Sequence, residues 1–187
     1  MKNLAKESAI NLNSLPYQEI GEFPKTLSQG NIIKRFIDGL GYRYYWATES
    51  LTQSDLSFSI SDESRSSFET LEHILDISGF ILRISQGKYN ATPTKKEKLN
   101  FDQIRSRTLN ELKEASHLMA QITDEDFKSL EILIQQGENK FALPLWNLLN
   151  GPISDAIHHV GQIVSFRRGS GNPINPNVDI FTGKNRE

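Results

Sequence analysis

The sequence predicts an all-α protein, a four-helix bundle with one long crossover and an irregular N-terminal extension. Three observations lead to this prediction. Apolar residues recur at helical spacing in four long segments, strand patterns are sparse, and Gly-Ser-Gly-Asn-Pro at residues 169–173 is a strong stop signal after the last segment. We expect an extension (1–28), a bundle (29–170) and a C-terminal tail (171–187).

Each predicted helix has its own justification. The first carries apolar residues three and four apart, although Gly39 and Gly41 weaken it by roughly 1 kcal/mol each relative to alanine. The second begins with a capping box formed by Ser66 and Glu69 and ends before Gly87. The third has one apolar stripe. The four predicted helices cover residues 31–51, 66–86, 101–122 and 144–168.

The fourth helix is expected to be interrupted. Pro144 is a favoured first-turn residue, and Gly151-Pro152 should kink or break the helix just before Asp155. The connectors expected between the helices are residues 56–64, 87–98 and 124–136, the last of which is also considered as a short helix.

Composition limits the classes of protein to consider. The 187 residues are 37% hydrophobic, enough for one core, and a net charge of −2 gives no electrostatic reason to expect nucleic acid or an acidic membrane as a partner. Cysteine is absent, which excludes cysteine-ligated metals and thiol catalysis by the chain and fits a reducing cytoplasm, where we expect the protein. No segment approaches the roughly 18–20 apolar residues of a membrane span.

The most informative segment lies in the fourth predicted helix. Asp155 and His159 are four residues apart, so they share a face of the helix, one turn apart. Buried polar groups need a partner, which is either a metal ion or a hydrogen bond within the core. His159 has Ala156 and Ile163 as helical neighbours and is placed on the buried face, whereas the neighbours of His158 are mostly polar.

A second histidine completes a candidate metal site. His73 lies in the middle of the second predicted helix, and with Asp155 and His159 it would supply two imidazoles and one carboxylate. Three protein ligands leave open positions for water or substrate, as catalytic sites require. His117 has no partner at metal-ligand spacing in its helix, and it is interpreted as a surface or packing residue.

Two passages connect the chain to a known family. They are Ser67-Phe-Glu-Thr-Leu-Glu-His73-Ile-Leu, and Pro144-Leu-Trp146 with Asp155-Ala-Ile-His-His159-Val-Gly-Gln-Ile163. The second is similar to the signature His-x-x-His-His-Arg-Gly-Gln. Over about residues 29–170 the chain resembles the DinB/YfiT-like superfamily of metal-binding four-helix bundles.

The resemblance implies that His73 and His159 match the first and last metal histidines of the family. Asp155 stands where the family more often has its second histidine, and Val160 replaces the common arginine. An aspartate also ligates divalent ions, so the implied ligands are His73, Asp155 and His159. The exchange makes iron, manganese or nickel as credible as zinc.

The resemblance also implies a divalent-metal-dependent enzyme. Several members are thiol S-transferases that use low-molecular-weight bacterial thiols, and others are similar to maleylpyruvate isomerase. The expected chemistry is that of a transferase or hydrolase with a metal-activated thiol or water, and the thiol would come from a small-molecule substrate because the chain has no cysteine. The alternative is a non-catalytic helical bundle with a vestigial metal site that acts through a protein partner, and a homodimer is left open.

Further residues are candidates around this site. Glu69 and Gln162 are expected to orient the imidazoles, with a solvated glutamate and a packing amide as alternatives. Arg167 and Arg168 are candidates to hold an anionic substrate, although the helix dipole alone favours cations there. Aromatic residues considered for a pocket, with a core position as the alternative, are Tyr42, Tyr44, Tyr45 and Trp146.

Overall fold

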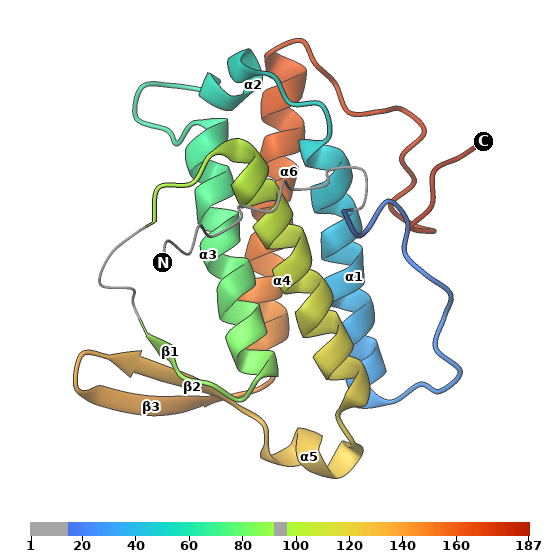
Figure 1. The fold of residues 1–187 in the computed structure, drawn as a ribbon, viewed down its shortest axis with the longest axis vertical. Helices are drawn as coiled ribbons and strands as arrows, with labels where there is room; N and C mark the ends of the chain where they lie inside the picture. The colour runs from blue at the N-terminus through green and yellow to red at the C-terminus, as the bar shows by residue number, and fades with distance from the viewer. Residues whose placement is uncertain (1–14, 92–96) are drawn as a thin grey trace, which may run out of the picture.

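Four long helices dominate the structure, a computed structural model that describes residues 15–91 and 97–187 (Figure 1). They lie side by side: α1 and α3 each pack against both α4 and α6, so that α1 lies diagonally opposite α3, and α4 lies diagonally opposite α6. The fold is mostly helical, as predicted. The bounds are α1 Gln29–Thr48, α3 Ser67–Ser85, α4 Phe101–Gln121 and α6 Ser154–Gly169.

The helices do not simply alternate in direction. Figure 1 shows α3 and α4 running the same way, from the end of the molecule near the short helix α2 (Gln53–Ser57) to the end near α5 (Asp124–Ser129). The connection between α3 and α4 therefore joins opposite ends of these two helices. Residues 92–96 of this connection and residues 1–14 of the predicted extension lie outside the described residues.

Local side chains determine where α3 begins and ends. The Ser66 hydroxyl accepts a hydrogen bond from the Glu69 amide, and the Glu69 carboxylate accepts one of 2.8 Å from the Ser66 amide. The predicted capping box is therefore confirmed. At the other end, Gly87 has a φ of 62°, a left-handed conformation that glycine adopts without steric cost.

The core is built from the facing apolar stripes of the four helices. Its largest fully buried aliphatic residues are Ile37, Leu40, Leu71, Ile74, Ile81, Ile84, Ile104, Leu109, Leu112 and Met119. Tyr42 and Tyr44 are fully buried, and Tyr45 is buried as well, so these aromatic residues belong to the packed interior. Trp146 is 74% exposed.

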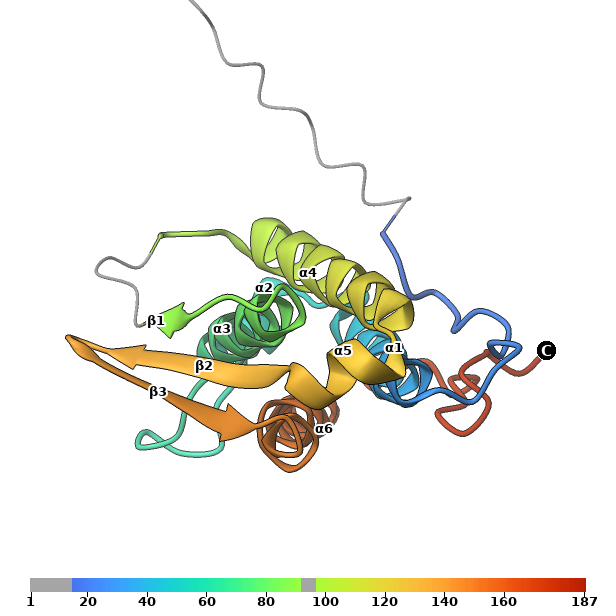
Figure 2. The same ribbon diagram turned by 90° about the horizontal axis from the view of Figure 1, so that it is seen from below.

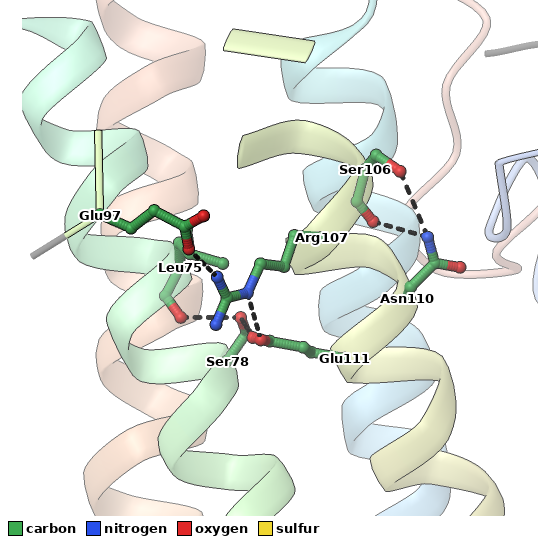
Figure 3. Close-up of polar contacts among 7 residues, drawn as sticks. All are labelled: Leu75, Ser78, Glu97, Ser106, Arg107, Asn110 and Glu111. Carbon is green, nitrogen blue, oxygen red and sulfur yellow. Dashed lines mark hydrogen bonds and ion pairs between the residues drawn. The ribbon is translucent and has the colours of Figure 1, made fainter. Parts of the chain in front are cut away.

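A polar contact links α3 to α4 at the edge of this core (Figure 3). The Ser78 hydroxyl lies 2.7 Å from Glu111 Oε2, and Arg107 Nε donates to Glu111 Oε1 at 2.9 Å. Arg107 also reaches Glu97 at 3.1 Å, on the segment that leads into α4. The negative charge of the mostly buried Glu111 carboxylate is thus compensated by Arg107, and Ser78 hydrogen-bonds to it.

A small sheet was not predicted. β2 (Glu131–Gln136) pairs in antiparallel fashion with β3 (Asn139–Pro144) and in parallel with β1 (Asn90–Ala91), and Figure 2 shows this hairpin extending away from the helices. The interpretation of 124–136 as one short helix is wrong beyond Ser129. The cause is local: Ile132 and Ile134 favour a strand, and Gly137, with a φ of 62°, takes the first position of a two-residue turn.

The fourth helix also starts later than predicted. Pro144 is the last residue of β3, and α6 is preceded by a π-helical turn, Leu149–Ile153. Inside that turn Gly151 has φ −96° and ψ −105°, outside the helical region, and Pro152 has no amide hydrogen to donate. The predicted interruption before Asp155 is therefore confirmed.

Both chain ends that the structure describes pack on α1. The Tyr17 ring lies so close to Gly41 that a β-carbon there would be 2.4 Å from it, which explains a glycine inside this helix. Ile20 N donates to Gly183 O at 2.8 Å, so the segment before α1 is joined to the tail.

None of the helices among the described residues combines the length and apolarity that a membrane span requires.

Candidate metal centre

The three residues predicted as metal ligands face one another across two helices. His73 comes from α3, and Asp155 and His159 come from α6. His73 Nε2 lies 3.7 Å from Asp155 Oδ2, and His159 Nε2 lies 3.4 Å from Asp155 Oδ1. One potential ligand atom from each residue lies within 4.8 Å of the others.

This spacing fits the coordination sphere of a transition-metal ion. Ligand atoms about 2.1 Å from a tetrahedral ion are about 3.4 Å apart, which is close to both carboxylate–imidazole distances. The two imidazoles meet edge to face, with ring centroids 4.6 Å apart. Two nitrogens and one oxygen form a donor set suited to zinc, iron, manganese or nickel.

Burial increases from the carboxylate to His159. The Asp155 side chain is 50% exposed, that of His73 is 32% exposed and that of His159 is 12% exposed. The cluster therefore lies near the surface of the molecule, with Asp155 on the solvent side.

Gln162 contacts the ring nitrogen of His159 that faces away from Asp155. Gln162 Oε1 lies 2.7 Å from His159 Nδ1, and its Nε2 lies 3.4 Å from His158 Nε2. With the amide in this orientation, Nδ1 of His159 carries the hydrogen and donates it to the amide oxygen. A neutral imidazole then keeps a lone pair on Nε2, the atom that faces Asp155, which is the tautomer that metal ligation requires.

The environment of His73 also favours the neutral imidazole. Burial lowers its pKa, and the positive charge of Arg65 and the proximity of His159 lower it further, while Asp155 and Asp76 act in the opposite direction. The net pKa is below the ordinary value for histidine. A neutral His73 is available as a ligand at neutral pH.

A groove opens beside the cluster between α3 and the π-helical turn. Its volume is about 720 Å³, and Asp155 forms part of its wall, so the groove is continuous with the candidate metal site. Its lining residues are Asp76, Ile77, Phe80, Asn150, Gly151, Pro152, Ser154 and Asp155. The sequence pointed to Asp155, Gly151 and Pro152 as residues near the site, but not to Asp76, Phe80 or Asn150. The one signal available for Asp76 and Phe80 was their helical spacing after His73, and Asn150 had none.

Glu69 does not lie beside an imidazole, although its expected role was to orient one. Its carboxylate accepts hydrogen bonds from the Ser66 amide and from the Ser66 hydroxyl, both at 2.8 Å, at the exposed N-terminus of α3. These hydrogen bonds lower its pKa. The structure thus uses Glu69 as a helix cap and brings Gln162, but not Glu69, to an imidazole.

Arg167 does not reach the candidate site. It is only 3% exposed, and its guanidinium donates to the carbonyl oxygens of Trp46, Ala47 and Asn172 at 2.7–3.1 Å. The residue ties the end of α6 to α1 and to the tail, so the expectation of a substrate-holding role is replaced by a structural one. Arg168 is exposed, about 14 Å along the helix axis from His159.

The other two histidines are placed as expected. His158 is exposed and points its ring toward Gln162, and its centroid is 5.4 Å from that of His159. His117 is exposed on α4, 2.8 Å from Gln121. Neither belongs to the cluster of His73, Asp155 and His159.

A solved structure has the same fold. The chain is similar to a DinB-like protein of Bacillus subtilis, YjoA, with 19% sequence identity and a TM-score of 0.58, over 78% of this chain and 96% of that one. No protein-family model and no curated protein matches the sequence. The chain therefore has a DinB-like fold, and the resemblance noted in the sequence is confirmed at the level of the fold.

Proposed function

We propose that the chain is a four-helix bundle of the DinB-like class that binds a divalent metal ion through His73, Asp155 and His159. The observation that carries the proposal is the convergence of these three side chains from α3 and α6, with ligand atoms within 4.8 Å. The tautomer of His159 that Gln162 favours supports it further.

The proposed activity is that of a metal-dependent transferase or hydrolase. His73, Asp155 and His159 would hold the divalent ion, which would supply a Lewis acid able to make a water molecule or a substrate thiol nucleophilic at neutral pH. The side chains of the protein do the rest: Gln162 holds the proton on His159 Nδ1, and the groove beside Asp155 receives the organic part of the substrate. Because the chain has no cysteine, a low-molecular-weight thiol is the proposed co-substrate.

Metal analysis tests the first part of the proposal. Protein purified without a nickel column should contain close to one equivalent of a divalent metal, or should bind zinc, nickel, iron or manganese with that stoichiometry after treatment with a chelator. A stoichiometry far below one for all four metals would overturn the metal proposal.

A thiol-transfer screen tests the second part. The metal-loaded protein should accelerate the attack of a low-molecular-weight thiol on an electrophile such as monochlorobimane, and the His73→Ala variant should not. Tight metal binding without any transfer or hydrolysis would favour the alternative, a non-catalytic bundle that acts through a protein partner.

A further inference from the structure

A second pocket lies between the end of α1 and the start of α4, outside the candidate metal centre. Its volume is about 370 Å³, and none of its lining residues belongs to α3 or α6. We propose that this pocket binds a small zwitterion such as a free amino acid, with the carboxylate of the ligand on Arg105 and its ammonium group beside Asp102 and Glu49.

Arg105 is the central group of this pocket. It lines the pocket but is only 8% exposed. Its Nε donates to the Thr48 hydroxyl at 3.0 Å, its Nη2 lies 3.4 Å from Tyr45 O, and its Cζ lies 4.7 Å from the centre of the Tyr45 ring. The Thr48 hydroxyl in turn donates to Tyr44 O at 2.7 Å, so it acts as an acceptor toward Arg105. These contacts hold the guanidinium in one orientation before a ligand binds.

The guanidinium of Arg105 is a buried charge without an ion pair to any carboxylate of the described residues. Within the same part of the chain, no acceptor takes a hydrogen bond from Nη1. A guanidinium has five N–H donors, and buried arginine residues are normally paired. A carboxylate that enters the pocket accepts from the unused donors and supplies the missing negative charge.

Two carboxylates in the wall of the pocket determine what else the ligand carries. Asp102 is exposed in the first turn of α4, three residues before Arg105 and on the same face of the helix. Glu49 follows α1 and accepts a hydrogen bond of 2.6 Å from the Ser50 hydroxyl. A simple anion on Arg105 is repelled by both carboxylates, whereas a zwitterion has a partner for each of its charges. Because the charge of Glu49 also acts on the buried Arg167, the ammonium group is assigned chiefly to Asp102.

Leu51 and Phe101 add apolar surface to the pocket. Both line it, and both are only partly buried. An aliphatic or aromatic side chain that lies against them removes apolar surface from water. Among zwitterions, the pocket therefore favours amino acids with an apolar side chain, such as leucine.

Leucine and two derivatives that each lack one charge test the proposal. N-acetylleucine keeps only the carboxylate, and leucinamide keeps only the ammonium group. Each is titrated into the chelator-treated, ¹⁵N-labelled full chain at about pH 6.5, where both amines are charged, and the amides of Leu51 and Asp102 are followed. Leucine should bind at least about tenfold more tightly than either derivative, because each derivative loses one charge-assisted contact. Equal or tighter binding of either derivative, or no saturable shift with leucine up to about 10 mM, would overturn the inference.

Two double variants with the same change of charge show where the ammonium group binds. Asp102→Asn with Glu49→Gln removes both carboxylates from the pocket, and the preference for leucine over N-acetylleucine should fall at least about fivefold. Asp124→Asn with Glu125→Gln, in the first turn of α5 and outside the pocket, should leave the preference unchanged. A preference that is the same in both double variants would contradict the proposal.

Arg105→Gln tests the carboxylate half of the site. The variant should lose about tenfold of the preference for leucine over leucinamide, because the amide of glutamine carries no charge. Its ¹⁵N spectrum shows whether the fold is retained, and the double variant of the two carboxylates tests the pocket without any change to this buried residue. A folded Arg105→Gln protein with the full preference would also overturn the inference.

The pocket and the candidate metal centre have no residue in common, so the two proposals fail separately. A protein that binds leucine as described but no metal would retain the pocket and lose the metal function. A protein that binds zinc stoichiometrically but gives no shift with leucine would retain the metal function and lose the pocket.

Discussion

Asp155 is the residue on which the metal proposal depends most. It is the one carboxylate between two imidazoles, and it lies within 3.7 Å of both. Its exposed position means that its removal disturbs little packing. Substitutions there report on ligation with little interference from folding.

Replacing Asp155 tests whether this residue is a metal ligand. Asp155→Ala should weaken zinc binding by about 100-fold or more, because loss of groups that only support ligands already costs about 10–100-fold. Asp155→His should keep tight binding, since an imidazole suits the same metals. Competition with a chromogenic chelator measures both, and His158→Ala is the matched control that should bind as the wild type does. An Asp155→Ala variant with unchanged affinity would show that Asp155 is not a ligand.

Asp55 is a second informative carboxylate, and it has a structural role. It is 2% exposed and accepts hydrogen bonds from the Thr52 amide at 2.7 Å and from Asn172 Nδ2 at 2.8 Å, as well as from Ser170. Burial by itself would raise the pKa of Asp55, but the hydrogen bonds from Ser170, Asn172 and Thr52 outweigh it and hold the pKa well below its usual range. The first turn of α2 is thereby fastened to the end of α6.

The lowered pKa of Asp55 predicts how stability depends on pH. A carboxyl whose pKa is lower in the folded state contributes its full stability above its unfolded pKa of about 3.9, and the contribution is lost as the pH falls below that value. Asp55→Asn should cost about 2 kcal/mol at pH 7, and the difference from the wild type should shrink below about pH 4. Urea unfolding at pH 7 and pH 3 checks this, and a difference that is constant with pH would contradict it.

Among the secondary-structure elements, the π-helical turn before α6 has the clearest functional consequence. It ends at Ile153, two residues before Asp155, and it forms one wall of the groove. Because Pro152 cannot donate a hydrogen bond and Gly151 is not helical, the helix direction changes immediately before the cluster. The turn therefore positions Asp155 relative to His73.

Removal of the kink tests this positioning. In a double variant, Gly151→Ala with Pro152→Ala, the turn regains an amide donor and a preference for helix, so the ladder of hydrogen bonds can continue. We expect weaker zinc binding together with an unchanged or higher melting temperature. Gly161→Ala, at a position in α6 with open space around it, is the control and should not change zinc binding. Unchanged affinity in the double variant would show that the kink does not position the ligand.

At the scale of the whole molecule, the segments before α1 and after α6 act as a cover for α1. Tyr42, which is fully buried, donates to Asn185 Oδ1 at 2.8 Å and accepts from the Asp179 amide at 3.2 Å. Figure 1 shows the tail beside α1, away from α3. The cover is thus separate from the cluster between α3 and α6.

Deletion of residues 177–187 should therefore affect stability and not metal binding. The deletion exposes Tyr42 and Ile20 and removes the hydrogen bond between Ile20 N and Gly183 O, so it should cost about 2 kcal/mol or more. Thermal unfolding measures the loss, and chelator competition should give the zinc affinity of the full chain. A truncated protein that is equally stable would show that the tail does not act as a cover.

The sequence by itself determined the first three long helices, the later part of the fourth and the composition of the candidate site. Ser66, Glu69 and Gly87 act within a few residues of the chain, so the start and end of α3 could be predicted from local rules. The spacing of Asp155 and His159 likewise depends only on the geometry of one helix. Their relation to His73 was inferred from chemistry and from the resemblance, not from distance along the chain.

Only the tertiary structure decided how the remaining groups are used. Glu69 and Gln162 looked equally suitable beside an imidazole, and Arg167 looked like a surface cation, because a sequence does not show which partner a side chain meets across the fold. Packing places Gln162 on His159 and buries Arg167 against the carbonyls at the end of α1. The pairing of β2 with β1, about 40 residues earlier, was likewise not visible in the sequence, and the groove exists only where α3 meets the turn before α6.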